Sequence, residues 1–459
     1  MGGGLMQLVA YGAQDVYLTG NPQITFWKVS YRRHTNFAME SIEQTFNGQA
    51  DFGRRVTCTI SRNGDLCYRT YLQVTLPEIN QNMANSGVAG VTNSGVYARW
   101  LDFPGEQLIS QVEVEIGGQR IDRQYGDWMH IWNQLTLTSE QQRGYYKMVG
   151  NTTQLTFITD PSFNDVDGPC ESNAPRQVCA PRNALPETTL YVPLQFWYCR
   201  NPGLALPLIA LQYHEVKINL DIRPIDECLW AVSSLECTTN KGVKVTTAYN
   251  QSLVAASLYV DYVFLDTDER RRMAQNPHEY LIEQLQFTGD ESVGSSSNKI
   301  KLNFNHPVKE LVWVVQPDEN VDYCSSLECA QTLFSTLGAQ PFNYTDAVDA
   351  LPNAIHSFGG PEGVAADSGA YITSQGLFND AGAADATTTT WWNGATAPDF
   401  YSAPRLGQTG IVNSGVSDAG TFVLSETSLD MHCWGENPVV TAKLQLNGQD
   451  RFSEREGTY

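Results

Sequence analysis

Two stretches of this 459-residue chain nearly repeat each other: "VEVEIGGQRID" at 112–122 and "AKLQLNGQDRF" at 442–452. Each alternates apolar and polar residues, reaches a glycine followed by glutamine, and then carries an arginine. Alternation with a period of two is typical of a half-buried β-strand, and the glycine marks the turn that follows it. Two copies of one β unit are the simplest explanation for such a distant match.

Further markers occur in the same order in both halves of the chain. "ESIEQTFNG" at 40–48 is echoed by "YLIEQLQFTG" at 280–289, and "SRNGDLCYRTYLQVTL" at 61–76 has a looser counterpart in "FNHPVKELVWVVQP" at 304–317. Three ordered matches make chance similarity of separate strands a poor explanation. The sequence therefore predicts two tandem copies.

The spacing of the markers predicts a long insertion in the second copy. Ile42 and Ile282 are 240 residues apart, whereas Gly118 and Gly448 are 330 apart, so the second copy carries about 90 extra residues. They fall in 318–435, which is dense in Gly, Ala, Thr, Ser and Asn. That composition is typical of a surface excursion.

Strand signals dominate the chain, because runs rich in β-branched and aromatic residues are bounded by Gly, Pro, Asn or Asp. The predicted strands are 54–62, 68–76, 109–116, 214–222, 257–265, 279–287, 300–305, 310–316 and 442–446. Helices are predicted at 126–149 and at 266–275, the latter ending before Asn276-Pro277. The pattern indicates an all-β sandwich architecture with a few helices in its connections.

The second copy is shorter at its end than the first. About 150 residues follow Gly118 before the predicted linker helix, whereas only 11 follow Gly448. A sandwich without its last strands exposes apolar faces and unpaired strand edges. We expect either that the chain is a fragment of a longer polypeptide or that another chain supplies these strands.

Composition excludes several classes of function. The formal charge of −21 repels nucleic-acid phosphate, so direct nucleic-acid binding is not expected. No segment approaches the ~20 apolar residues that cross a bilayer. The ten cysteines form no CxxC pair, which favours reduced thiols over a zinc site. Disulfides Cys170–Cys179 and Cys324–Cys329 are the alternative in an oxidising environment.

A family resemblance rests on long motifs. They are "LMQLVAYGAQDVYLTGNPQITFWKVSYRRHTNFAMESIEQTFNG" (5–48), "SRNGDL" (61–66), "VEVEIGGQRID" (112–122), "NPGLALPLIALQYHEVK" (201–217), "VDYVFLDTDERRRMAQ" (260–275), "PHEYLIEQLQFTG" (277–289) and "LNGQDRF" (446–452). In these motifs the chain resembles the major capsid proteins of nucleocytoplasmic large DNA viruses. The match is dense from residue 5 to about 317 and returns at 440–459; residues 318–439 resemble nothing that we can place.

The resemblance implies a double jelly roll, two eight-stranded sandwiches in one chain. The expected division is an inward-facing anchor at 1–26, a first jelly roll at 27–265, a linker helix at 266–276 and a second, incomplete jelly roll at 277–459 with the insertion 318–435 as an outer tower. It also implies a homotrimer that forms a pseudo-hexagonal capsomer and tiles an icosahedral shell. Neighbouring capsomers, minor capsid proteins and an internal membrane are the implied partners, and the virion, assembled in the host cytoplasm, is the implied location.

Candidate sites are few. Asn343, Asn151 and Asn250 begin glycosylation triplets, and Asn343 in the expected tower is the first choice. Lys28, Arg32 and Arg33 either contact inner partners or anionic lipid, or pair with nearby carboxylates.

Catalytic signals are weak. No nucleophile elbow, phosphate loop or HExxH pair is present, and the seven histidines are scattered, so no catalytic, metal or cofactor residue is predicted. "TGDESVGSSS" at 288–297 is too sparse in carboxylates for a calcium loop.

Three functions remain to compare. A self-assembling capsid subunit fits the duplicated β unit best. A glycan-binding β-sandwich, using Trp391 and Trp392 in the insertion, is the alternative. A carbohydrate-active enzyme needs a carboxylate pair across a groove, and nothing in the sequence selects one.

Overall fold

The computed structural model describes most of the first half of the chain and parts of the second. The described residues are 3–9, 12–83, 96–156, 159–161, 179–181, 185–232, 244–294, 297–321, 323, 339–344 and 437–459.

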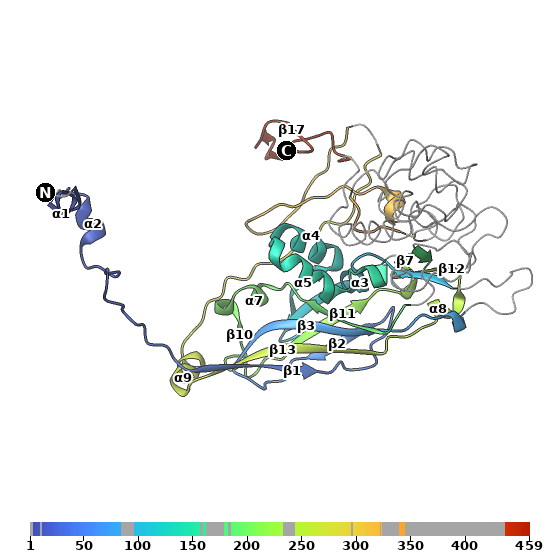
Figure 1. Ribbon diagram of the computed structural model, residues 1–459, viewed down its shortest axis with the longest axis horizontal. Helices are drawn as coiled ribbons and strands as arrows, with labels where there is room; N and C mark the ends of the chain where they lie inside the picture. Colours follow the sequence, from blue (N-terminus) through green and yellow to red (C-terminus); the bar gives the residue numbers. More distant parts are fainter. Residues whose placement is uncertain are drawn as a thin grey trace, which may run out of the picture.

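Two antiparallel sheets pack face to face to form the main body (Figure 1). One has the order β1-β13-β3, and both β9 and β10 pair with the free edge of β3; the other has the order β2-β11-β5-β6. The strands of the first sheet are β1 Phe37–Gln44, β3 Leu66–Leu76, β9 Thr188–Pro193, β10 Leu206–Pro207 and β13 Ala255–Leu265. Those of the second are β2 Arg55–Thr59, β5 Ile109–Ile116, β6 Gln119–Tyr125 and β11 Val216–Ile222.

The alternation read from the sequence sets which side of each strand is buried. In β11 the apolar Val216, Ile218, Leu220 and Ile222 are buried, while the polar residues between them are partly exposed. Each such apolar side chain stabilises the sandwich by about 1.5–3 kcal/mol. The core between the sheets therefore follows from the period-two pattern.

The first and last strands of this unit close it. Strand β1 pairs with β13 along its whole length, from Phe37 opposite Leu265 to Gln44 opposite Leu258. These partners are more than 200 residues apart in sequence. Residues 37–265 thus form one structural unit whose first and last strands are paired with each other.

The two stretches that opened the sequence analysis form the same local structure. Strands β5 and β6 join through Gly117 and Gly118, with φ of 61° and 85°. Strands β15 Gln445–Leu446 and β16 Gln449–Asp450 join through Asn447 and Gly448, with φ of 52° and 80°. Two consecutive positive φ values define the two-residue hairpin turn that favours glycine and asparagine.

Helices cover one edge of the sandwich. The predicted helix 126–149 is two helices, α4 Gly126–Thr136 and α5 Ser139–Val149, separated by the extended residues Leu137 and Thr138. Helix α4 contacts β5 and β6 while α5 contacts β9, so the pair bridges the two sheets. Short α3 Pro104–Leu108 packs beneath them.

The predicted linker helix is present as α9 Thr267–Gln275. The Asp266 side chain accepts the Thr267 N–H at its start. The remaining short elements are α1 Gly3–Val9, α2 Asp15–Thr19, β4 Tyr97–Trp100, α6 Thr153–Thr156, β7 Thr159–Pro161, β8 Cys179–Pro181, α7 Trp197–Arg200, β12 Leu229–Val232, α8 Thr246–Tyr249, β14 Thr441–Ala442 and β17 Arg455–Glu456.

The chain after α9 differs from the prediction. Residues 277–317, apart from the undescribed 295 and 296, run without any assigned strand, so the strands predicted at 279–287, 300–305 and 310–316 are wrong as strands of this structure. Alternation specifies which residues suit a strand, but a strand forms only when a neighbouring strand accepts its hydrogen bonds. Among the described residues, no strand pairs with these segments.

Candidate assembly surfaces

The N-terminal arm, residues 12–36, extends away from the sandwich and is exposed along its length (Figure 1). Large apolar side chains lie in the open: Tyr17 is 89% exposed, Trp27 89% and Phe26 fully. Helix α1 adds further exposed residues, including Leu8. Exposed apolar surface on this scale is typical of an interaction site.

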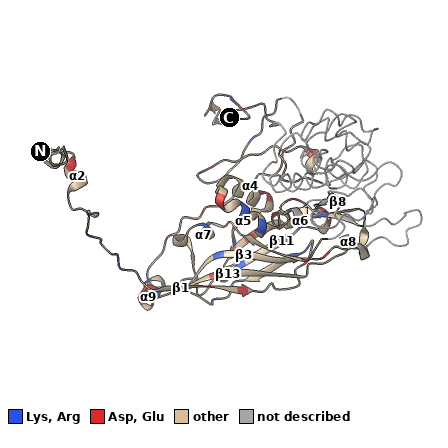
Figure 2. Cartoon of the chain, viewed as in Figure 1, with Lys and Arg blue, Asp and Glu red and all other residues tan. Residues whose placement is uncertain are grey.

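The three predicted basic residues of the arm, Lys28, Arg32 and Arg33, are all exposed. None of them forms an ion pair within the part of the chain that the structure describes. The interpretation that they pair with nearby carboxylates is therefore not observed, and their charges point into solvent. Helix α9, by contrast, carries acidic and basic residues side by side (Figure 2).

The arm is fixed at its root. The Thr35 hydroxyl donates a hydrogen bond to Glu269 of α9 at 2.6 Å. Two arginines of α9 form ion pairs, Arg270 with Asp65 at 3.0 Å and Arg271 with Asp268 at 3.9 Å. The arm therefore begins at the end of the sandwich where α9 lies.

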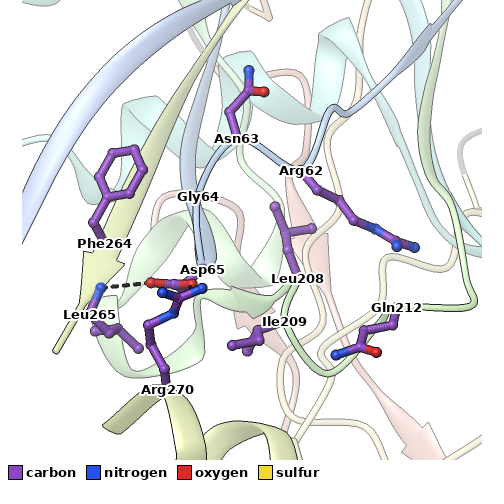
Figure 3. A pocket seen from close by; sticks show the side chains of 10 residues that line it. All are labelled: Arg62, Asn63, Gly64, Asp65, Leu208, Ile209, Gln212, Phe264, Leu265 and Arg270. Atoms are coloured by element: carbon purple, nitrogen blue, oxygen red, sulfur yellow. Dashed lines mark hydrogen bonds and ion pairs between the residues drawn. The ribbon is translucent and has the colours of Figure 1, made fainter. Parts of the chain in front are cut away.

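An open pocket of about 330 Å³ lies at this same end (Figure 3). Leu208 and Ile209 contribute an apolar surface, and Arg62 and Arg270 lie on either side of them. Both oxygens of Asp65 are already used, one by Arg270 and the other by the Leu265 N–H at 2.8 Å.

The guanidinium of Arg62 is held at the rim by backbone carbonyls. Its Nη2 donates to the carbonyls of Leu211 at 2.6 Å and His214 at 3.1 Å. The pocket thus combines an apolar floor with two fixed cations and no free carboxylate. Nothing in the sequence pointed to it, because its lining comes from four separate segments.

A buried polar cluster lies beneath α4. The carboxylate of Glu106, which is fully buried, meets His130 Nδ1 at 2.7 Å, Asn133 Nδ2 at 3.3 Å and the Tyr145 hydroxyl. The contact with Glu106 and burial raise the pKa of Tyr145, with burial the larger cause. The cluster resembles a catalytic constellation in its residue types, but its side chains are buried, which suits them to fixing α3, α4 and α5 together.

A short segment at 339–344, which belongs to the expected tower, packs on that cluster. The Phe342 ring stacks on His130 with centroids 4.2 Å apart and meets the edge of Phe103 at 5.8 Å. Arg99 donates to the Ala339 carbonyl at 3.3 Å. The beginning of the insertion is therefore packed on the first sandwich rather than projecting freely from it.

A second joint connects the first sandwich to the chain after α9. The Leu285 N–H donates to Asp122 Oδ1 at 3.1 Å, and Phe287 meets Tyr125 edge-on at 5.2 Å. Burial raises the pKa of Asp122 to about 6, although the hydrogen bonds from Leu285, Gln124 and the Arg123 backbone favour the carboxylate. A carboxyl group whose pKa is raised to about 6 thus lies at this joint.

The glycosylation candidates differ in access. Asn343 is 5% exposed and donates through Nδ2 to Gln340 at 2.8 Å, and Asn151 is 1% exposed. Asn250, at the end of α8, is exposed. Glycan attachment needs an accessible side-chain amide, so burial disfavours the first choice, Asn343.

Other predicted features can be placed only in part. Among the described residues, no group of three or more His, Cys, Asp or Glu side chains could hold a metal ion. Of the helices that the structure describes, none is both long and apolar enough to cross a membrane. Several predicted features lie outside the described residues: Trp391, Trp392 and the cysteine pair Cys324–Cys329. The side chains of Cys170 and Cys179 are not described either.

Two family models match the chain with almost no gap between them. The model described as major capsid protein N-terminus matches residues 25–266, and the model described as large eukaryotic DNA virus major capsid protein matches 269–459. The chain belongs to the major capsid proteins of large eukaryotic DNA viruses. The boundary between the two matched regions falls at the start of α9.

Individual members of the family are similar along the entire chain. The major capsid proteins of Phaeocystis pouchetii virus and Chrysochromulina ericina virus are 76% and 73% identical, each over 100% of this chain and over 84% and 85% of their own lengths. A solved capsid of PBCV-1 is similar over 95% of this chain and 75% of its own, with 30% identity and a TM-score of 0.53. The all-β capsid fold predicted from the sequence is confirmed.

Proposed function

We propose that this chain is the building block of an icosahedral virus shell and that it works as a homotrimer. Three copies, each with two sandwiches, would present six similar units around one axis and pack against neighbouring capsomers. In this proposal residues 27–265 form the first jelly roll, 266–276 the linker, and 277–459 the second unit with the outward insertion 318–435. The family membership over the whole chain is the observation that carries it.

The surfaces of the chain support self-assembly. The core described above lies almost entirely within 37–265, while the arm and residues 277–317 leave many large apolar side chains exposed, among them Trp313 at 62%. Stable obligate interfaces are large and apolar, and they usually bury upwards of ~2,000 Å². Such surfaces are costly for an isolated subunit and favourable in an assembly.

Light scattering of the purified full chain, coupled to size-exclusion chromatography, tests this proposal. We expect a species of three times the chain mass at micromolar concentration, in both 50 mM and 500 mM salt. Negative-stain images of that species should show particles with three-fold symmetry. A chain that stays monomeric across concentration and salt contradicts the proposal.

We further propose that the arm faces inward, toward minor capsid proteins and an internal membrane. The exposed Tyr31, close to Lys28, Arg32 and Arg33, completes a pattern that binds anionic membrane surfaces. Flotation with phosphatidylserine vesicles should retain the chain, whereas phosphatidylcholine vesicles should retain less. Substitution of all three basic residues by Glu should abolish that difference, and equal retention of wild type and triple variant would refute it.

For glycan attachment, we propose Asn250 in place of the two buried asparagines. Its exposure at the end of α8 is what supports it. Peptide mapping by mass spectrometry of chain taken from particles should find any sugar there, and a sugar on Asn343 instead would refute the choice.

A further inference from the structure

The pocket between Arg62 and Arg270 has the chemistry to bind an aromatic side chain. Leu208, Ile209 and Phe264 supply apolar contact, and two guanidinium groups lie at its sides (Figure 3). A guanidinium stacks favourably on the face of an aromatic ring, and tryptophan gives the strongest such contact. Because Arg62 and Arg270 are already held by protein atoms, a ring entering the pocket would not have to order them.

The arm carries a suitable side chain that is largely exposed. Trp27 is 89% exposed and lies eight residues before Thr35, which is fixed to α9 beside the pocket. Eight extended residues span at most about 29 Å. Two sheets packed face to face are about 10 Å apart, so that length exceeds the spacing of the sheets within one sandwich.

The sequence of the arm disfavours return to its own pocket. Between Trp27 and Thr35 the chain reads "KVSYRRH", which contains Ser30 but none of the stronger turn formers Gly, Pro, Asn and Asp. The structure accordingly shows an arm that leads away from the body (Figure 1). In copies that stand side by side in the same orientation, the root of each arm and the pocket of the next copy lie at the same level, because both belong to the α9 end.

We propose that the pocket at Arg62 and Arg270 receives Trp27 from the arm of a second copy of this chain. This inference rests on the proposed self-assembly and names a contact that holds neighbouring copies together. The contact is heterologous, since arm and pocket are different surfaces, and contacts of this kind can close into a ring.

Disulfide trapping tests whether the arm that reaches the pocket comes from the same chain or from a second copy. Val29 is exposed and lies two residues after Trp27 in the arm, and Gln212 lines the pocket. In the full chain carrying Val29→Cys and Gln212→Cys, mild oxidation should link different copies, at least tenfold more than in either single variant. Val29→Cys with Gln49→Cys, an exposed position beyond the opposite end of β1, is the matched control.

Affinity is the second readout. Trp27→Ala should raise the dissociation constant of the oligomer about 30-fold, as expected for loss of an aromatic anchor. Tyr17→Ala, which removes an equally exposed aromatic from the same arm, should change it less than threefold.

The outcomes separate this inference from the proposed function. An intact trimer without the 29–212 link, or with unchanged affinity after Trp27→Ala, overturns the inference and leaves the proposed function standing. A 29–212 link within one chain overturns the choice of a second copy. A chain that is monomeric by light scattering overturns both.

Discussion

Asp122 should make the stability of this protein depend on pH in a direction opposite to that of most carboxylates. Its side chain joins β6 to the chain after α9, and burial raises its pKa from 3.8 to about 6. A group whose pKa is raised on folding stabilises the folded state while it is protonated. This contribution is complete below about pH 4 and is lost as the pH rises through 6.

The shift sets the magnitude of the effect. About two pKa units correspond to about 3 kcal/mol at 1.36 kcal/mol per unit. Roughly half of this, about 1.4 kcal/mol, is lost between pH 5 and pH 7.5. That interval avoids the sequence pI of about 4.7, where the chain carries little net charge and tends to precipitate.

The substitution Asp122→Asn removes the titration and keeps an oxygen to accept the Leu285 N–H. Urea unfolding of wild type and variant at half-unit steps from pH 5 to 7.5 should give a difference in the free energy of unfolding that changes by about 1.4 kcal/mol, with the variant gaining relative to wild type as the pH rises. Asp51→Asn is the control. Burial raises the pKa of Asp51, but hydrogen bonds from Leu253 and Phe52 lower it overall. The difference in the free energy of unfolding between wild type and Asp51→Asn should therefore change at lower pH than for Asp122, and in the opposite direction. A difference for Asp122→Asn that is constant with pH would refute the reasoning.

Three other predictions follow from the packing. Phe342→Ala should lower the free energy of unfolding by about 3 kcal/mol, because it removes the ring stacked on His130, while Phe342→Leu should cost less; equal effects in chemical denaturation would contradict this. Gly64→Ala places a Cβ 2.7 Å from Tyr262 and should destabilise by about 1–3 kcal/mol, whereas Gly144→Ala in α5, with open space around it, should stabilise by up to about 1 kcal/mol; thermal melts showing the same sign for both would count against it. Four buried cysteines should resist alkylation at pH 8 until the protein unfolds, since burial raises their thiol pKa values, to about 11 in Cys58 and about 12 in Cys199; rapid labelling found by peptide mapping would refute their burial.

The first sandwich was predictable because its signals are local. Alternation gave the inward face of β3, β5, β11 and β13, and a glycine at a positive-φ turn fixed both hairpins. The break between α4 and α5 also had a signal, since Thr138 is followed three residues later by Gln141, a pattern typical of a helix start. The prediction of one helix overlooked it.

The rest depended on contacts that no local pattern records. The strands predicted after α9 have the right alternation, but a hydrogen-bonding neighbour is a property of the fold rather than of the segment. The pocket combines residues near 62, 208, 264 and 270, and Phe342 meets His130 across more than 200 positions. Composition suggested a surface excursion for 318–435 and the family resemblance implied an outer tower, whereas residues 339–344 are packed on the first sandwich.

The distribution of buried and exposed apolar residues separates the free energy of folding of the first sandwich from the free energy of association of the outer segments. The core in 37–265 stabilises one sandwich within a single copy, whereas the side chains of the arm and of 277–317 gain burial only against something else. If other copies supply that burial, the apparent stability of these outer segments must rise with protein concentration, while the stability of the first sandwich must not. Limited proteolysis at increasing concentration distinguishes the two: cleavage within the arm should slow as copies associate, and a cleavage rate independent of concentration would mean that the arm finds no partner in its own kind.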